Sequence, residues 1–134
     1  MSIAYITCDE ARHAYHVMMA AIEGEQHACL HPGIYENMLS SCLERPQVHF
    51  QGYTPYADVF SKAGALLECV SSSNAFIDGS KRMGFLLCDL FLERNGCYVD
   101  PNAPIVQFVL SVAKGDLDVA AIGRWLQSHT IRKH

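Results

Sequence analysis

The segment from 81 to 95, "KRMGFLLCDLFLERN", constrains the fold of this chain more than any other. Apolar side chains occupy nearly every side of a helix drawn through it, and such a helix is stable only where neighbours cover it all round. Asn95 and Gly96 then supply a typical stop signal for a helix. The segment therefore predicts a central, buried helix around which the rest of the chain packs.

Apolar residues before this segment recur at helical spacing, which predicts further helices packed against it. Thr7 and Glu10 have the spacing of a capping box, so a first helix is expected to begin there and to stop at Gly24. A second helix is expected to carry the apolar residues of 34–43. It should end before Pro46, because proline disfavours the helical conformation in the residue preceding it.

Three more helices are expected in the remaining sequence. One runs over about 56–71, directly before the central helix. The next has Pro104 in its first turn, where proline is favoured, and reaches Ala113. The last begins at a cap supplied by Asp116 or Asp118, since aspartate accepts hydrogen bonds from the free amides of a first turn.

The segment 47–53, "QVHFQGY", alternates weakly between apolar and polar residues and is bounded by Pro46, Gly52 and Pro55. This pattern predicts a short extended excursion. Half of the 134 residues are hydrophobic, which is enough for one domain with a core of its own. Residues 1–134 are therefore predicted to form a single, compact, all-α domain.

Charge and composition exclude several classes of function. The net charge of −4, with scattered bases, argues against direct binding of nucleic acid. No uninterrupted apolar run reaches the roughly 18 to 20 residues needed to span a bilayer, and the first residues lack the pattern of a signal peptide. The six cysteines form no CxxC pair and are expected to be reduced, partly as small core residues. We expect a cytoplasmic protein.

The loop before the central helix, within "SSNAFIDGSKRMGF", carries the strongest functional signal. The free amides and the dipole of a helix beginning there favour an anion, and Gly79 allows the backbone to approach it closely. Lys81 and Arg82 add positive charge, and Asp78 could hold a divalent cation that bridges phosphates. The alternative is that Asp78 or Ser80 only caps the helix, with both bases solvated. Spacing alone favours the capping alternative, because short loop motifs often match by chance.

The loop "NAFIDGSKR" resembles the active-site loop of the Fic/Doc family, whose pattern is His-x-Phe-x-Asp/Glu-Gly/Ala-Asn-Lys/Gly-Arg. The matching residues are Phe76, Asp78, Gly79, Lys81 and Arg82. The segments "LERPQ", "KAGALLECV" and "FLERNGCYVD" are similar to the Doc branch as well, and Lys81 also agrees with that branch. The resemblance covers about residues 33–128.

The resemblance implies a Fic/Doc-like helical bundle that transfers a phosphate-containing group from ATP to a protein hydroxyl. In the Doc branch it implies a toxin that phosphorylates a translation factor such as elongation factor Tu and is neutralised by a small Phd-like antitoxin. It assigns the phosphates to Gly79, Ser80, Lys81 and Arg82, with Mg²⁺ held through Asp78. It assigns alignment of the target peptide to a flap that would contain Val48, His49 and Phe50.

Two positions depart from the family pattern. Asn74 stands at the position of the catalytic histidine, and Ser80 at that of a phosphate-binding asparagine. An asparagine amide cannot accept a proton near neutral pH, and loss of a general base typically costs ~10²- to 10⁴-fold in rate. The sequence therefore indicates a transferase that is weakened or inactive. The alternatives are a nucleotide- or protein-binding pseudoenzyme and, more weakly supported, an AMP transferase.

Overall fold

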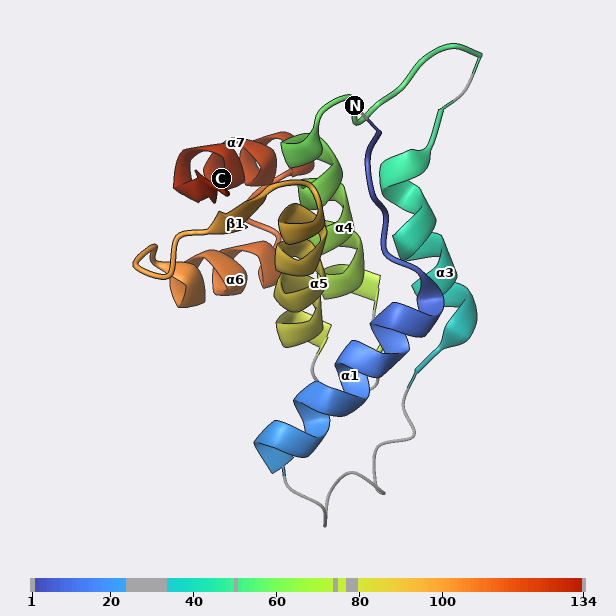
Figure 1. The fold of residues 1–134 in the computed structure, drawn as a ribbon, viewed down its shortest axis with the longest axis vertical. Helices are drawn as coiled ribbons and strands as arrows, with labels where there is room; N and C mark the ends of the chain where they lie inside the picture. The colour runs from blue at the N-terminus through green and yellow to red at the C-terminus, as the bar shows by residue number, and fades with distance from the viewer. Residues whose placement is uncertain (1, 24–33, 50, 74, 77–79, 134) are drawn as a thin grey trace.

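The computed structural model describes residues 2–23, 34–49, 51–73, 75–76 and 80–133, and the statements below refer to these residues. The fold is mostly helical, and Figure 1 shows the helices gathered around α4 and α5. In chain order the elements are α1 (Cys8–Glu23), α3 (Glu36–Glu44), the short 3-10 helix η1 (Arg45–Gln47), α4 (Val59–Ser73), α5 (Ser80–Arg94), β1 (Cys97–Val99), α6 (Ile105–Ala113), α7 (Val119–His129) and β2 (Thr130–Arg132). The predicted all-α class is confirmed.

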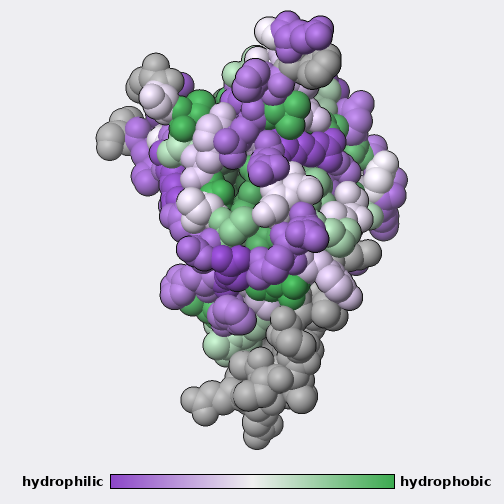
Figure 2. All heavy atoms as spheres, turned by 90° about the vertical axis from the view of Figure 1, so that its right-hand side faces the viewer, coloured by the Kyte–Doolittle hydropathy of each residue, from purple (hydrophilic) through white to green (hydrophobic). Residues whose placement is uncertain are grey.

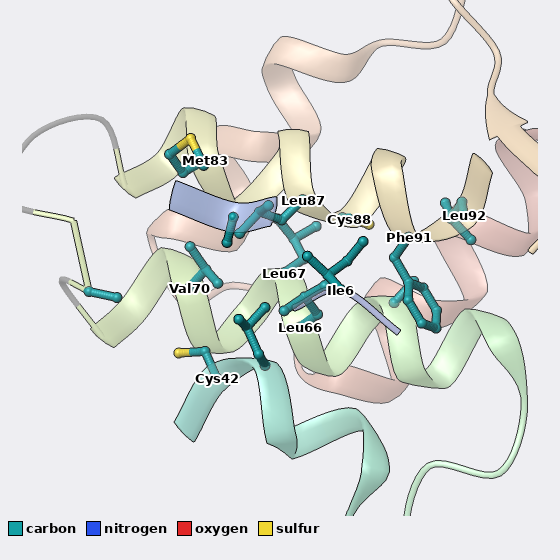
Figure 3. Packing of buried hydrophobic residues seen from close by; sticks show 14 of the residues in the cluster. Ile6, Cys42, Leu66, Leu67, Val70, Met83, Leu87, Cys88, Phe91 and Leu92 are labelled. Carbon is teal, nitrogen blue, oxygen red and sulfur yellow. The ribbon is translucent and has the colours of Figure 1, made fainter. Parts of the chain in front are cut away.

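The helix α5 is the centre of the core, as its sequence predicts. It contacts α1, α4, α6 and β1. Its inward residues are almost completely buried: Met83, Leu87, Cys88, Phe91 and Leu92. In Figure 3 the side chains of α5 and α4 point toward one another, and Cys42 joins them from α3. One side of α5, at Phe85, Leu86 and Leu90, is only partly buried, so the helix is less enclosed than its apolar sequence predicts.

The predicted helix caps are present. The Thr7 amide donates to Glu10 Oε1 at 2.9 Å, and the Glu10 amide donates to Thr7 Oγ1 at 3.2 Å, which is the reciprocal pattern of a capping box. Asp118, the second of the two predicted alternatives, accepts a hydrogen bond from the Ala121 amide. These local signals were reliable because both partners lie within one turn of each other.

The helix α4 begins at Val59, three residues later than the sequence pattern predicts. Asp58 explains the later start, since its Oδ1 accepts a 2.8 Å hydrogen bond from the Ser61 amide and so caps the first turn. The antiparallel pair β1–β2, in which Cys97 pairs with Arg132 and Val99 with Thr130, was not predicted from the sequence. Strands of three residues are too short to show an alternating pattern.

The surface is mixed in character. Figure 2 shows a face dominated by hydrophilic residues, with apolar residues in small separate groups. None of the described helices is both long and apolar enough to cross a membrane. Cys42, Cys88 and Cys97 are buried, as predicted for cysteines that act as small core residues.

Candidate functional site

The residues that flank the predicted loop are fixed in the core. Ala75 and Phe76 follow α4 directly and are 0% and 1% exposed. The Phe76 ring stacks on Tyr15 of α1 with the ring centroids 4.9 Å apart. The Ala75 amide donates to Ser73 Oγ at 3.3 Å, which ties this residue back to the last turn of α4. Phe76 therefore fixes the chain before the loop in the core.

A second segment, distant in sequence, borders the same loop. Ile34 and Phe76 form an isolated antiparallel bridge, and the Tyr35 amide donates to the Ala75 carbonyl at 2.8 Å. At the start of α5, the Ser80 hydroxyl donates to the Phe76 carbonyl oxygen at 2.7 Å. Both ends of the loop are thus held by hydrogen bonds to buried backbone, which fixes the position of the first turn of α5.

The first turn of α5 presents two exposed bases, Lys81 and Arg82. Among the described residues neither has an ion-pair partner. The amides of this turn have no acceptor within the helix, and the helix dipole adds partial positive charge. Bases, amides and dipole act in the same direction, so this end of α5 is suited to hold an anion such as a phosphate group.

Both bases line a hollow of about 680 Å³ between α5, α6 and the end of α1. Its walls are mostly apolar, with Met18, Phe85 and Val109 among the lining residues. Asp89 lies in the same wall, and burial raises the pKa of its carboxyl group. A hollow with apolar walls and positive charge at one end can accept a ligand that joins an apolar or aromatic part to an anionic group.

Four of the predicted site residues lie outside the described part of the chain: Phe50, Asn74, Asp78 and Gly79. The roles given to them by the family resemblance therefore stay predictions. This applies to the missing general base at Asn74 and to a magnesium ligand at Asp78.

The structure does not bring Val48 and His49 to the loop. Both are exposed and precede α4, whereas the loop follows it, and a helix of 15 residues is about 22 Å long. In Figure 1 the connection from α3 to α4 lies at the upper end of α4, and the segment at Ala75 and Phe76 lies at the lower end. The extended residues beside the loop are instead Ile34 and Tyr35.

Two residues were not predicted from the sequence: Tyr15, which contacts Phe76 beside the loop, and Lys62, which lies at the opposite end of α4. Lys62 is 6% exposed, and its Nζ donates to the Pro46 carbonyl at 2.9 Å, which fixes η1 against α4. Its signal was a single lysine within the apolar run "KAGALL". The contact of Tyr15 with Phe76 depends on tertiary packing and leaves no local signal.

Comparison with known proteins places the chain in a family. A relative, the Toxin Doc of Mycolicibacterium smegmatis, is 34% identical over 59 residues, which cover 44% of this chain and 45% of that toxin. The chain therefore matches less than half the length of this relative. The family model described as the Fic/DOC family matches residues 5–92, which is more than half of the chain and includes both ends of the loop. The chain belongs to the Fic/DOC family.

Proposed function

We propose that the chain is a Doc-like toxin whose site binds ATP and transfers a phosphate group to a hydroxyl of a protein target, with activity weakened or abolished by Asn74. The observation that supports the proposal most is the first turn of α5. There Lys81 and Arg82, which pair with no acid in the described part of the chain, line one end of a hollow, and the hydrogen bond from Ser80 to Phe76 holds the turn in place. The similarity to a Toxin Doc agrees with it.

The described residues fit a triphosphate. Arginine can bind two phosphate oxygens at once, and lysine supplies a compact positive charge. Lys81 and Arg82 would neutralise the phosphates, and the amides of Gly79 and Ser80 would donate hydrogen bonds to them. Magnesium would be held through Asp78, and when bound it would offset phosphate charge. Phosphoryl transfer depends mainly on such positioning and charge stabilisation.

The residue at position 74 determines how fast we expect the phosphate transfer to be. A histidine at this position would accept the proton of the attacking hydroxyl, which an asparagine amide cannot do. We therefore expect Asn74→His to raise the rate of transfer by ~10²- to 10⁴-fold over the chain with Asn74. The assay uses ATP labelled on the γ-phosphate with elongation factor Tu as the first target. Absence of transfer even with Asn74→His would contradict the kinase proposal, and transfer of a label on the α-phosphate would indicate AMP transfer instead.

Binding is tested separately from transfer. Lys81→Ala and Arg82→Ala should each weaken ATP binding about 10- to 100-fold, since a hydrogen bond to a charged group contributes about 1.5–3 kcal/mol. Lys114→Ala and Arg124→Ala are matched controls, because both residues are exposed and neither lines the hollow. Calorimetry measures the four affinities. ATP binding without transfer, also after Asn74→His, would identify a nucleotide-binding pseudoenzyme.

A toxin of this family is expected to have a neutralising partner. The proposed partner is a small Phd-like antitoxin, encoded by a short neighbouring reading frame. Co-expression of the two chains should give a complex that survives purification and should relieve any growth defect caused by the Asn74→His variant. Growth arrest that persists with the neighbouring chain present would argue against this partner.

A further inference from the structure

The hollow at the start of α5 is lined by charges of opposite sign at its two ends. Lys81 and Arg82 line it in the first turn of the helix, and Asp89 lines it eight residues after Lys81. At the usual rise of a helix, the two ends lie about 12 Å apart along the axis. Phe85 and Leu86 line the stretch between them, and α6 borders one side (Figure 1). The hollow therefore presents bases, apolar surface and a carboxylate in that order.

The carboxylate of Asp89 has one oxygen engaged and one unused. Its Oδ1 accepts a 3.2 Å hydrogen bond from the Val99 amide, which fixes the side chain against β1. Its Oδ2 has no hydrogen-bond partner among the described residues and is not enclosed by them. No base in the described part of the chain forms an ion pair with Asp89. A partly buried oxygen of this kind is stabilised when an N–H group of a ligand reaches it.

We propose that Asp89 selects the base of the bound nucleotide, because its Oδ2 accepts a hydrogen bond from the 6-amino group of adenine. The inference rests on the nucleotide binding proposed above and adds the residue that distinguishes ATP from other nucleoside triphosphates. With the phosphates at Lys81 and Arg82, the base extends along the apolar walls toward Asp89. The separation of about 12 Å between the two ends is comparable to the length of a nucleotide from its phosphates to its base.

The hydrogen bonding of Asp89 favours adenine over the related purines. Hypoxanthine and guanine carry a carbonyl oxygen where adenine carries the amino group, and this oxygen would face the carboxylate without a hydrogen between them. Guanine can pair with a carboxylate through two adjacent N–H groups, but such a bidentate pair uses both oxygens. The Oδ1 of Asp89 is already occupied by the Val99 amide. A site built to bind a polar group rejects an analogue that lacks this group.

Asp89 is the one acid among the described residues that line this hollow. A neighbouring hollow of about 750 Å³ lies between α1 and α5, and Met18 and Asp89 line both. Glu93 lines only the neighbouring hollow, one turn further along α5. The two acids therefore carry the same charge on the same helix, but only Asp89 borders the space in which the base is proposed to bind.

The test measures binding of ATP, ITP, GTP and tripolyphosphate to the full-length wild-type protein by calorimetry, with magnesium present. ITP differs from ATP in carrying a carbonyl oxygen in place of the amino group. We expect ATP to bind about 10- to 100-fold more tightly than ITP or GTP. In Asp89→Asn the side-chain amide can accept from an amino group or donate to a carbonyl oxygen, so the ratio of the ATP and ITP affinities should fall to about 1. A general change in charge does not alter this ratio, because the two nucleotides carry the same phosphates.

Glu93→Gln is the matched control, since it removes the same charge from an exposed position of α5 and should keep the wild-type ratio. Circular dichroism checks that each variant is folded. Tripolyphosphate has no base and reports on Lys81 and Arg82 alone. If it binds while wild type does not distinguish ATP from ITP, or prefers GTP, the anion site stands and the proposal for Asp89 is overturned. If neither tripolyphosphate nor any nucleotide binds, the proposed function itself fails, and the selection by Asp89 fails with it.

Discussion

The Ser80 hydroxyl donates a 2.7 Å hydrogen bond to the carbonyl oxygen of Phe76, so the first residue of α5 is tied to the buried aromatic residue before the loop. Phe76 is itself held by Tyr15 and by the bridge to Ile34. The anion site proposed at Lys81 and Arg82 therefore rests on a fixed frame. The family pattern has an asparagine at this position. Here the residue is Ser80, and its side chain fixes the start of the helix.

Replacing Ser80 tests whether this frame matters for binding. Ser80→Ala removes the hydrogen bond and should lower the free energy of unfolding by about 1 kcal/mol. It should also weaken ATP binding, because the first-turn amides are less well positioned. Chemical denaturation and calorimetry measure the two effects. Ser128→Ala is the control, since Ser128 also donates to the backbone carbonyl four residues before it, but does so within α7. Equal ATP affinity of Ser80→Ala and wild type would show that the frame is dispensable.

The second prediction concerns the close packing of α4 and α5 at Gly84. A Cβ at Gly84 would lie 2.5 Å from Ser71 Oγ and 3.1 Å from Leu67 Cδ1. Gly84→Ala should therefore destabilise the protein by about 1–3 kcal/mol, which is the usual cost of overpacking. Thermal or urea unfolding measures the loss.

The double variant separates overpacking from an effect on the helix itself. The Ser71 hydroxyl is buried and has no hydrogen-bond partner among the described residues, so Ser71→Ala alone should cost little. Combined with Gly84→Ala, it removes the closest contact and should recover part of the lost stability. Strictly additive effects of the two substitutions would contradict the predicted contact.

Local signals predicted most of the fold. The capping box at Thr7 and Glu10 and the cap at Asp118 depend on residues within one turn, and the apolar sequence of α5 gave its central position. The strand pair at Cys97 and Arg132 joins residues 35 positions apart in sequence and offers no local pattern. The sequence therefore defined the helices well but could not show which distant segments would meet.

The site was predicted to a similar extent. The two bases at the start of α5 were identified from the loop motif, and both are exposed in the structure. The extended segment beside the loop was not identified, because helical spacing assigned Ile34 to the second helix. In the structure α3 begins only at Glu36, and Ile34 forms a bridge with Phe76. Lys62 shows the same limit, since its partner at Pro46 is fixed by the packing of η1 on α4.

We expect Asp89 to contribute to the dependence of stability on pH. Burial raises its pKa in the folded state, while its Oδ1 accepts a hydrogen bond from the Val99 amide. For an acid with a raised pKa, folding is favoured while the group is protonated, so stability falls as the pH rises above the unfolded value near 3.8. Asp89→Asn keeps the acceptor and removes the charge.

The substitution should therefore raise the free energy of unfolding at pH 7 and change it less at pH 3, where Asp89 is protonated in the folded state. Urea denaturation at the two pH values measures the difference. Asp116→Asn, at an exposed position, is the control. A variant that is less stable than wild type at pH 7 would show that the charge of Asp89 contributes favourably, contrary to the prediction.

Glu10 should affect the dependence of stability on pH in the opposite direction to Asp89. Hydrogen bonds from Arg94 and the Thr7 amide lower its pKa from 4.5 to about 2. A lowered pKa in the folded state gives stability that is fully present above about 4.5 and is lost as the pH falls toward 2. Both side chains of the Glu10–Arg94 pair are about a third exposed, so we expect a contribution of about 0.5–1 kcal/mol, near the upper end for surface pairs.

Glu10→Gln keeps an oxygen that can accept from the Thr7 amide and removes the charge that pairs with Arg94. We expect it to lower the free energy of unfolding at pH 7, where the pair is intact in wild type. Near pH 2 the wild-type carboxyl is half protonated, and the difference between the two proteins should shrink. Glu44→Gln is the control, since Glu44 is exposed and has no ion-pair partner among the described residues. A deficit of the same size at both pH values would mean that Glu10 stabilises the protein through the cap alone, and that its charge contributes nothing.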